Sequence, residues 1–356
     1  MIKNALVLTN GMLDTDFAKT CHGLLRGSTK FNIVGIVDEN HTGKDPSFAI
    51  GASQNLNIPI VKSISHFTEH YQIAVDYAII GIAVPGGQLP TALEKEILTA
   101  LSLGISIING LHTILSQRDD FASLARVNHC EITDIRKPKE FKQLSFWSGQ
   151  IMKIPIPKIA VLGMDCGVGK RTTCKFLLDR LNQYGLKTQM IYTGQTGWMQ
   201  GSSFGFILDS TLNDFVSGEL EKTILDCFEQ TNPQLILIEG QSSLRNPSGP
   251  CGSELLLSGN AKGVILQHAP GRKYYEDTNI PLGSVYDEIK LIKLYGSEVI
   301  AITLNEENCS DVELESIKQE IQRQTGIPTI RPLKNGVDEL IPVIEEFVIL
   351  SASGRT

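Results

Sequence analysis

The chain has 356 residues, of which 42% are hydrophobic and 20% are charged, and its formal net charge is −7 at pH 7. This acidic balance argues against nucleic-acid and anionic-membrane partners, because both attract basic surfaces. No apolar stretch approaches the ~18 residues that a membrane span needs, and the first residues lack a secretory pattern, so we expect a cytoplasmic protein. The seven cysteines are scattered, which is typical of reduced thiols rather than of a disulfide framework or a zinc site.

Strand-like and helix-like runs alternate in the first part of the chain. The expected strands are Ala5–Thr9, Phe31–Val37, Ile58–Val61, Tyr77–Ile82 and Ile105–Asn109, and the expected helices are Thr15–Leu25 and Pro90–Leu103. This alternation predicts a doubly wound, Rossmann-like domain over residues 1–145. The first turn of that domain lacks Gly-x-Gly-x-x-Gly, so the ligand of the domain stays open.

A second alternating series follows a proline-containing linker over residues 136–157. Its expected strands are Ile159–Leu162, Thr188–Tyr192, Leu235–Ile238, Gly263–Leu266 and Val299–Leu304, and its expected helices are Lys170–Tyr184, Leu212–Glu229, Val285–Leu294 and Val312–Thr325. We therefore predict an α/β protein with two doubly wound domains. The second is a P-loop NTPase-type domain over residues 150–356 with a mainly parallel sheet.

The function depends most on a glycine-rich turn between the first strand and the first helix of this second domain. Such a turn is the design of a phosphate-binding loop, in which backbone N–H groups converge on an anion and a lysine adds a full positive charge. The standard motif is Gly-x4-Gly-Lys-Ser/Thr. Here five residues separate Gly163 from Gly169, and Arg171 stands where a magnesium-binding hydroxyl normally follows the lysine. The expected phosphate-binding residues are Gly163, Asp165, Gly167, Gly169, Lys170, Arg171 and Thr172.

An acid ends a second apolar strand of the same domain, in the manner of a Walker B motif. Glu239 follows Leu235–Ile238, and an acid in that place can hold a magnesium ion beside bound phosphates. Asp165, inside the loop, is a second candidate ligand, although it can equally cap the following turn. If the site binds a metal, we expect Mg²⁺ at Glu239 or Asp165.

Polar residues also follow other strands of this sheet. Because ligands bind outside the carboxyl ends of parallel strands, we expect Gln195, Thr196 and Arg272 to bind the substrate. His268 is a candidate general base, since an unperturbed histidine titrates near neutrality. Asn305 is a candidate contact to the base of a nucleotide cofactor.

Two families share these motifs to different extents. Gly163–Lys170 with Glu239-Gly240 resembles the dethiobiotin synthetase branch of P-loop proteins, and this resemblance covers only the second domain. It implies an ATP- and magnesium-dependent ligase or kinase that acts on a small carboxylate. Two departures weaken it: Arg171 replaces the threonine that binds magnesium, and Thr193–Gly197 lacks the lysine that such synthetases use on their substrate.

A second resemblance covers nearly the whole chain and rests on motifs in a fixed order. They are Ile33–Asp38 with Gly43–Asp45, Gly81–Gly87, Gly110–His112, Asp134–Pro138, Gly163–Thr173, Thr193–Gly197 and Ile238–Gln241. Together they resemble the D-glutamate N-acetyltransferase-like family, which pairs an N-terminal Rossmann-like domain with a C-terminal P-loop domain. The resemblance implies transfer of an acetyl group from acetyl-CoA to the nitrogen of a D-amino acid, in D-amino acid metabolism.

Three classes of function are therefore open. An N-acyltransferase would bind the phosphates of acetyl-CoA in the P-loop and would use Glu239 or His268 as its base. A ligase or kinase would bind ATP there, and a nucleotide-binding regulatory protein would catalyse nothing. We expect the first class, with an amino acid as the small-molecule substrate. The identity of that amino acid and the formation of a homo-oligomer stay open.

Overall fold

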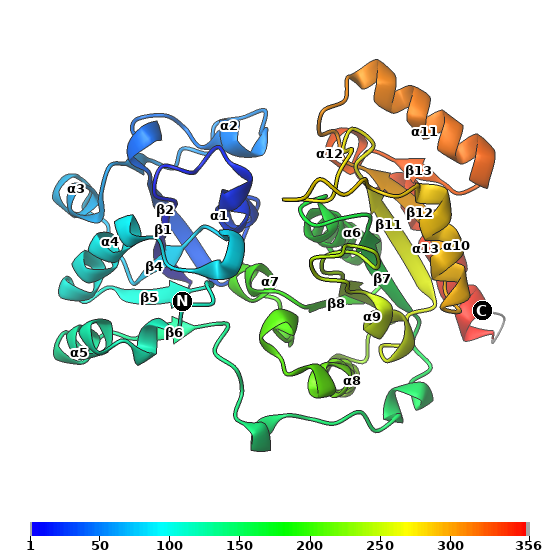
Figure 1. Ribbon diagram of the computed structural model, residues 1–356, viewed down its shortest axis with the longest axis horizontal. Helices are drawn as coiled ribbons and strands as arrows, with labels where there is room; N and C mark the ends of the chain where they lie inside the picture. Colours follow the sequence, from blue (N-terminus) through cyan, green and yellow to red (C-terminus); the bar gives the residue numbers. More distant parts are fainter. Residues whose placement is uncertain (1, 354–356) are drawn as a thin grey trace. The chain divides into compact units, whose positions relative to one another are not determined.

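The structure is a computed structural model that describes residues 2–353. The chain forms two compact units (Figure 1). The first unit contains the chain up to Lys139 together with Gln195–Ser202. The second unit contains Glu140–Gly194 and the chain from Ser203 onward. Each unit has its own parallel sheet, which confirms the α/β fold predicted from the sequence.

The first unit has the strand order of a Rossmann fold. Its sheet runs β3-β2-β1-β4-β5-β6, and each neighbouring pair of strands is parallel. The strands are β1 (Lys3–Leu8), β2 (Phe31–Val37), β3 (Ile60–Val61), β4 (Tyr77–Ile80), β5 (Ser106–Asn109) and β6 (Ile132–Asp134). The helices are α1 (Lys19–Leu25), α2 (Ser47–Ile50), α3 (Ile64–His70), α4 (Thr91–Ser102), α5 (Asp119–Val127) and α7 (Gln195–Gln200).

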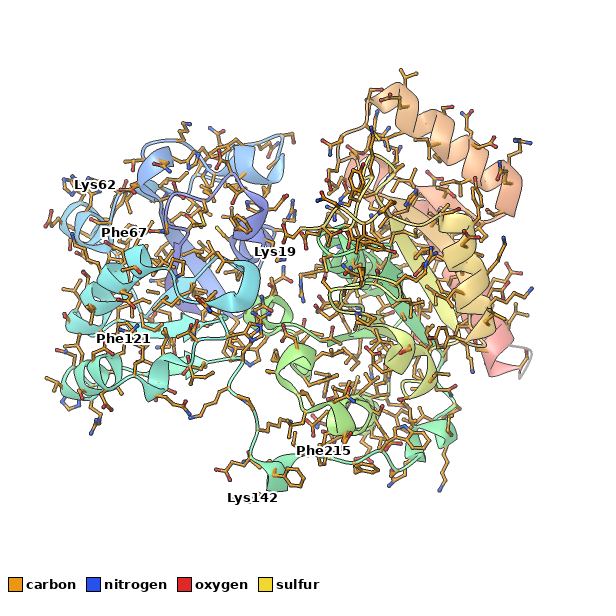
Figure 2. The ribbon with its side chains drawn as sticks, viewed as in Figure 1. Lys19, Lys62, Phe67, Phe121, Lys142 and Phe215 are labelled. Carbon is orange, nitrogen blue, oxygen red and sulfur yellow. The ribbon has the colours of Figure 1, made fainter. Side chains whose placement is uncertain are left out.

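Both faces of this sheet are buried. Along β1, Leu6 belongs to one hydrophobic cluster and Val7 to the other, because successive side chains of a strand point to opposite faces. Phe67 of α3 and Phe121 of α5 are fully buried in the cluster that contains Leu6 (Figure 2). Cys21 and Leu24 of α1 belong to the cluster that contains Val7, so helices cover both faces, as a parallel sheet requires.

The second unit repeats this design with a different strand order. Its sheet runs β13-β12-β11-β7-β10-β8-β9, again with parallel neighbours. The strands are β7 (Lys158–Gly163), β8 (Thr188–Tyr192), β9 (Phe204–Gly205), β10 (Leu235–Glu239), β11 (Gly263–His268), β12 (Glu298–Leu304) and β13 (Thr329–Ile330). The helices are α6 (Lys170–Tyr184), α8 (Asn213–Thr231), α9 (Ser253–Leu257), α10 (Val285–Leu294), α11 (Asp311–Thr325), α12 (Pro332–Asn335) and α13 (Ile341–Ala352).

The strand β10 shows why this second sheet is apolar along its whole length. Leu237 packs in the cluster that includes Leu177 of α6 and Phe347 of α13. Its neighbour Ile238 packs in the cluster on the other face, which includes Ile224 of α8. A continuous apolar run is therefore the expected sequence of a strand with helices on both sides.

The segment that the sequence predicts as a linker is held by hydrogen bonds within the second unit. Glu219 of α8 accepts a hydrogen bond from the backbone N–H of Ser145 at 2.8 Å. Glu221 accepts one from the backbone N–H of Ile151 at 3.1 Å. Both glutamates are buried, and these contacts hold residues 141–151 along α8 as a strap.

Close packing completes this contact. Phe215 of α8, which Figure 2 marks, lies with its ring centroid 5.0 Å from that of Phe141. At Gly218 the strap comes so near that an added Cβ would lie 2.0 Å from the carbonyl oxygen of Ser145. The strap therefore needs a residue without a side chain at this position of the helix.

Within residues 2–353, no helix is both long enough and apolar enough to cross a membrane.

The contact at Gly218 gives a prediction about stability. In a helix, alanine is more favourable than glycine by about 1 kcal/mol. Gly218→Ala would therefore stabilise the protein if the strap did not cover α8. Because the new Cβ would push the strap away, we expect a loss of about 1–3 kcal/mol in the free energy of unfolding, measured by urea titration. The control is Gly249→Ala, since a Cβ there meets nothing within 4 Å. A Gly218→Ala protein as stable as the control would contradict the packing argument.

Candidate functional site

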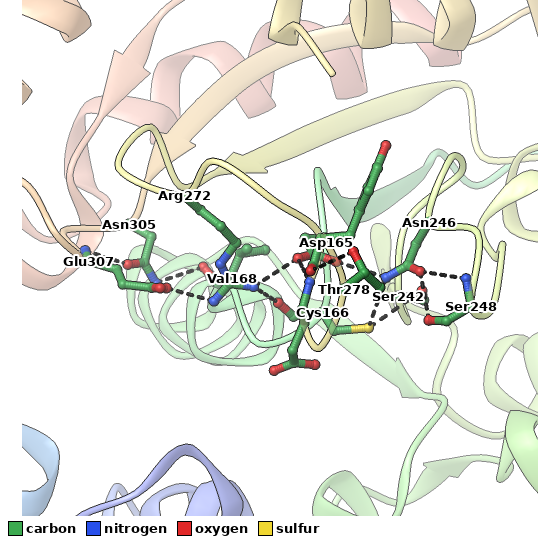
Figure 3. Close-up of polar contacts among 12 residues, drawn as sticks. Asp165, Cys166, Val168, Ser242, Asn246, Ser248, Arg272, Thr278, Asn305 and Glu307 are labelled. Carbon is green, nitrogen blue, oxygen red and sulfur yellow. Dashed lines mark hydrogen bonds and ion pairs between the residues drawn. The ribbon is translucent and has the colours of Figure 1, made fainter. Parts of the chain in front are cut away.

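The candidate site lies at the carboxyl edge of the second sheet. Strand β7 lies between β10 and β11, and β12 follows β11. Because all these strands are parallel, Gly163, Glu239, His268 and Asn305 stand at the same edge. Figure 3 shows the polar contacts that connect the loops after these strands.

The loop after β7 has the backbone shape of an anion cradle. Gly167 and Gly169 have φ angles of +65° and +103°, which residues with a Cβ rarely adopt. A Cβ on Gly163 would lie 2.8 Å from Cγ2 of Val168, so glycine lets the loop fold back on itself. Helix α6 begins at Lys170, and its first N–H groups, which lack partners within the helix, favour a negative charge.

Lys170 fastens this loop to its neighbour. Its Nζ donates to the carbonyl oxygens of Asp165 at 2.6 Å and Ser242 at 2.7 Å. Ser242 lies in the loop after β10, so one ammonium group connects two strand ends. Burial lowers the pKa of Lys170, while nearby Cys166, Asp165, Cys251 and Glu276 oppose that shift. A bound phosphate would stabilise the charged form.

Asp165 is fully buried and connects two further loops. Its Oδ1 accepts a hydrogen bond from Asn246 Nδ2 at 2.8 Å. Its Oδ2 accepts from Arg272 Nη1 at 3.0 Å and from the backbone N–H of Glu276 at 2.7 Å. Asp165 thus joins the loop after β7 to the loops after β10 and β11 (Figure 3).

Arg272 and Asn305 also support the loop. Arg272 donates to the carbonyl oxygen of Cys166 at 2.6 Å and to Glu307 Oε2 at 2.6 Å. Burial opposes its charge, but its bonds to Glu307 and Asp165 outweigh that effect and raise its pKa. Asn305 Nδ2 donates to the carbonyl oxygen of Val168 at 3.1 Å. Arg272 and Asn305, which we predicted to contact substrate and nucleotide, both bind the backbone of the phosphate loop.

Arg171 and Glu239 form an ion pair beside Lys170. Arg171 Nη2 donates to Glu239 Oε1, and the backbone N–H of Thr193 donates to Oε2 at 3.3 Å. Burial raises the pKa of Glu239, whereas Arg171 and the Thr193 N–H lower it. The carboxyl group is almost completely removed from solvent. Within residues 2–353, no three His, Cys, Asp or Glu side chains are grouped so that they could hold a metal ion.

His268 lies at the end of β11 and is partly buried. Among the described residues its buried Nδ1 has no hydrogen-bond partner. Burial lowers the pKa of this histidine to about 4, so the ring is neutral near pH 7. The preceding residue, Gln267, accepts hydrogen bonds from the hydroxyls of Thr173 and Thr303, at 2.6 and 2.7 Å, and so fixes α6 against the sheet.

The other two predicted substrate residues belong to α7 in the first unit. Gln195 Oε1 accepts a hydrogen bond from Arg136 Nη2 at 2.9 Å. The hydroxyl of Thr196 lies 3.5 Å from that of Thr20 in α1. Both side chains are therefore part of the contact between α7 and the rest of the first unit. Their role in substrate binding remains a prediction.

Sequence reasoning missed several residues that build the site. Ser242 and Asn246 come after β10, and Glu276 comes after β11, in stretches without regular periodicity. Ser242 has a φ of +39°, which a serine rarely adopts. The only signal was their place after strand ends of a parallel sheet.

Comparisons with known proteins agree with this architecture. A family model described as "Domain of unknown function (DUF1611_C) P-loop domain" matches residues 145–341. A second, described as "Domain of unknown function (DUF1611_N) Rossmann-like domain", matches residues 39–138. The crystal structure of a DUF1611 family protein from Anabaena variabilis is similar, with a TM-score of 0.88, 26% identity, and coverage of 97% of this chain and 99% of that one.

Two curated relatives are named D-glutamate N-acetyltransferase. The protein from Pseudoalteromonas sp. is 28% identical over 271 residues, which are 74% of this chain and 79% of that protein. The protein from Tritonibacter scottomollicae is 25% identical over 274 residues, which are 75% of this chain and 80% of that protein.

Replacing His268 should remove a pH-dependent loss of stability. Its pKa is about 4 in the folded chain against 6.5 ordinarily, so between these values the unfolded chain binds a proton that the folded chain does not. Stability is therefore complete above the unfolded pKa and falls as the pH drops toward the folded pKa. At about pH 5 the loss is about 2 kcal/mol.

In urea titrations at about pH 7 and about pH 5, the free energy of unfolding of His268→Asn should change by about 2 kcal/mol less than that of the wild type. His129→Asn, which alters an exposed histidine, is the control and should behave like the wild type. The same pH dependence in His268→Asn and wild type would contradict the prediction.

Proposed function

The chain belongs to the DUF1611 family, and on that premise we propose that it transfers the acetyl group of acetyl-CoA to the amino group of a D-amino acid. The observation that carries this proposal is the name that both curated relatives share over about three quarters of the chain. The cradle after β7 supports it, since a glycine-rich loop with two adjacent cations suits an anionic ligand.

Coenzyme A has groups that such a cradle can bind. It carries a pyrophosphate and a 3′-phosphate, and it needs no hydrolysis at either. Lys170 presents a point charge beside the loop, and Arg171 follows as the next residue of α6. Arginine can bind phosphate through two parallel N–H bonds. We infer that Lys170 and Arg171 hold phosphate groups of acetyl-CoA.

The reaction needs a group that accepts a proton. A D-amino acid enters as an ammonium ion and must lose a proton before its nitrogen attacks the thioester carbonyl. The new C–N bond then replaces the C–S bond, the nitrogen gives up a second proton, and the departing thiolate takes up a proton to give coenzyme A. A base works best when its pKa lies near the working pH. Burial moves the pKa of Glu239 upward and that of His268 down to about 4, so we assign the base to Glu239.

The direct test is an assay with the purified full-length chain. We expect release of the coenzyme A thiol from acetyl-CoA when a D-amino acid is added, with N-acetyl-D-amino acid detected by mass. D- and L-glutamate and D- and L-aspartate are compared, and a parallel set of reactions contains ATP and Mg²⁺ instead of acetyl-CoA. Turnover that requires ATP and Mg²⁺, or no thiol release with any D-amino acid, would contradict the proposal.

Lys170→Ala should weaken binding of coenzyme A by about 1.5–3 kcal/mol, because it removes a charged donor from the cradle. Calorimetric titration gives the dissociation constant. The matched control is Lys175→Ala, which removes a lysine farther along α6 that pairs with Asp179. We expect that control to keep wild-type affinity. Equal affinities for Lys170→Ala and wild type, with both folded, would remove Lys170 from the binding site.

Glu239→Gln should abolish most turnover while the protein still binds coenzyme A. The substitution keeps the shape of the side chain and removes its ability to accept a proton, and loss of a general base typically costs about 10²–10⁴-fold in rate. The matched variant is His268→Asn, which should keep most of its activity. Full activity in Glu239→Gln would assign the base to another residue.

A further inference from the structure

We propose that this P-loop binds the phosphates of its ligand without a divalent cation, and that the guanidinium of Arg171 takes the place that Mg²⁺ has in P-loop NTPases. The choice of coenzyme A as ligand rests on the proposed function, whereas the independence from Mg²⁺ rests on the residues of the loop alone. Three features of the site support it.

The hydroxyl that would bind Mg²⁺ is missing. In P-loop NTPases the Ser or Thr directly after the lysine supplies this hydroxyl. In this chain that residue is Arg171. Thr172 stands one position later, and each helical residue is rotated about 100° from the last, so it faces another direction. The next hydroxyl, on Thr173, is buried and donates to Gln267 Oε1 at 2.6 Å. These two threonines therefore do not replace the missing ligand.

The two acids that could bind Mg²⁺ already have partners at both carboxylate oxygens. Glu239 accepts from Arg171 and from the Thr193 N–H. Asp165 accepts from Asn246, Arg272 and the Glu276 N–H. Because Mg²⁺ requires nearly octahedral oxygen coordination and gives up its water reluctantly, it would have to displace several charged or backbone donors. The residues present do not fit this ion.

A permanent positive charge already stands beside the acid. Arg171 contacts Glu239 directly, and 17% of its side chain is exposed, so the side chain is not fully enclosed. A guanidinium has five N–H donors on separate edges, so it can bind a carboxylate and a phosphate together. Its positive charge would repel a nearby dication.

The test is a calorimetric titration of the full-length protein with coenzyme A, ADP and inorganic pyrophosphate, each in EDTA and in excess Mg²⁺. For wild type we expect dissociation constants that agree within about twofold between the two conditions for the probes that bind. An affinity that rises about tenfold or more with Mg²⁺ would overturn the proposal. Absence of binding by all three probes would overturn it as well.

Arg171→Thr introduces the residue that P-loop NTPases have after the lysine. This variant should bind the probes about tenfold or more weakly in EDTA, because it loses a charge-assisted contact to phosphate, and Mg²⁺ should recover part of that loss. Lys175→Thr makes the same kind of change farther along α6 and should match wild type in both conditions. Wild-type affinity of Arg171→Thr in EDTA would overturn the role of Arg171.

Glu239→Gln gives a prediction with a definite sign and does not depend on Arg171→Thr remaining folded. If Glu239 neutralises Arg171, removing its charge should leave coenzyme A affinity unchanged or higher in EDTA. If Glu239 holds Mg²⁺, the same change should weaken binding in Mg²⁺, and that result would overturn the proposal.

The titrations also separate the two proposals. Binding of ADP but not of coenzyme A would leave the Mg²⁺-independence standing, whereas the acetyltransferase proposal would fail.

Discussion

The geometry of the candidate site depends on the ammonium group of Lys170. Its bonds to the carbonyls of Asp165 and Ser242 close the loop after β7 against the loop after β10. An ammonium group has three donors, so these two bonds leave capacity for a ligand. Burial removes this group from water and lowers its pKa. An anion that enters the cradle would therefore replace part of the solvation that the ammonium group has lost.

Asp165 extends this arrangement to a third loop. Its carboxylate binds Asn246 on one side and Arg272 on the other, across sequence separations of 81 and 107 residues. A fully buried carboxylate is costly unless its oxygens are satisfied, so its partners must be in place whenever the unit is folded. Loss of one partner would therefore disturb the phosphate loop as well as the contact itself.

The sequence predicted the sheet of the second unit well and the loops above it poorly, for one physical reason. A strand such as Leu235–Glu239 is covered by helices on both faces, so its burial appears as a continuous apolar run. Asn246 is just as buried, but its partner Asp165 lies 81 residues away in the chain. No periodic pattern in the sequence indicates that contact. Short strands such as β9 and β13, of two residues each, are equally hard to predict from the sequence, and so is the short helix α7. So few residues show no periodic pattern of apolar side chains.

The pair formed by Arg171 and Glu239 shows how far a fold constrains chemistry. Strand order and the glycine loop form a cradle beside Lys170 that suits an anion. Whether the anion is then cleaved depends on a metal, a positioned water and the groups that hold them. A guanidinium in the place of the magnesium-binding hydroxyl keeps the electrostatic attraction and removes a ligand that the metal needs. The same fold can thus bind a phosphorylated cofactor without cleaving it at its phosphates.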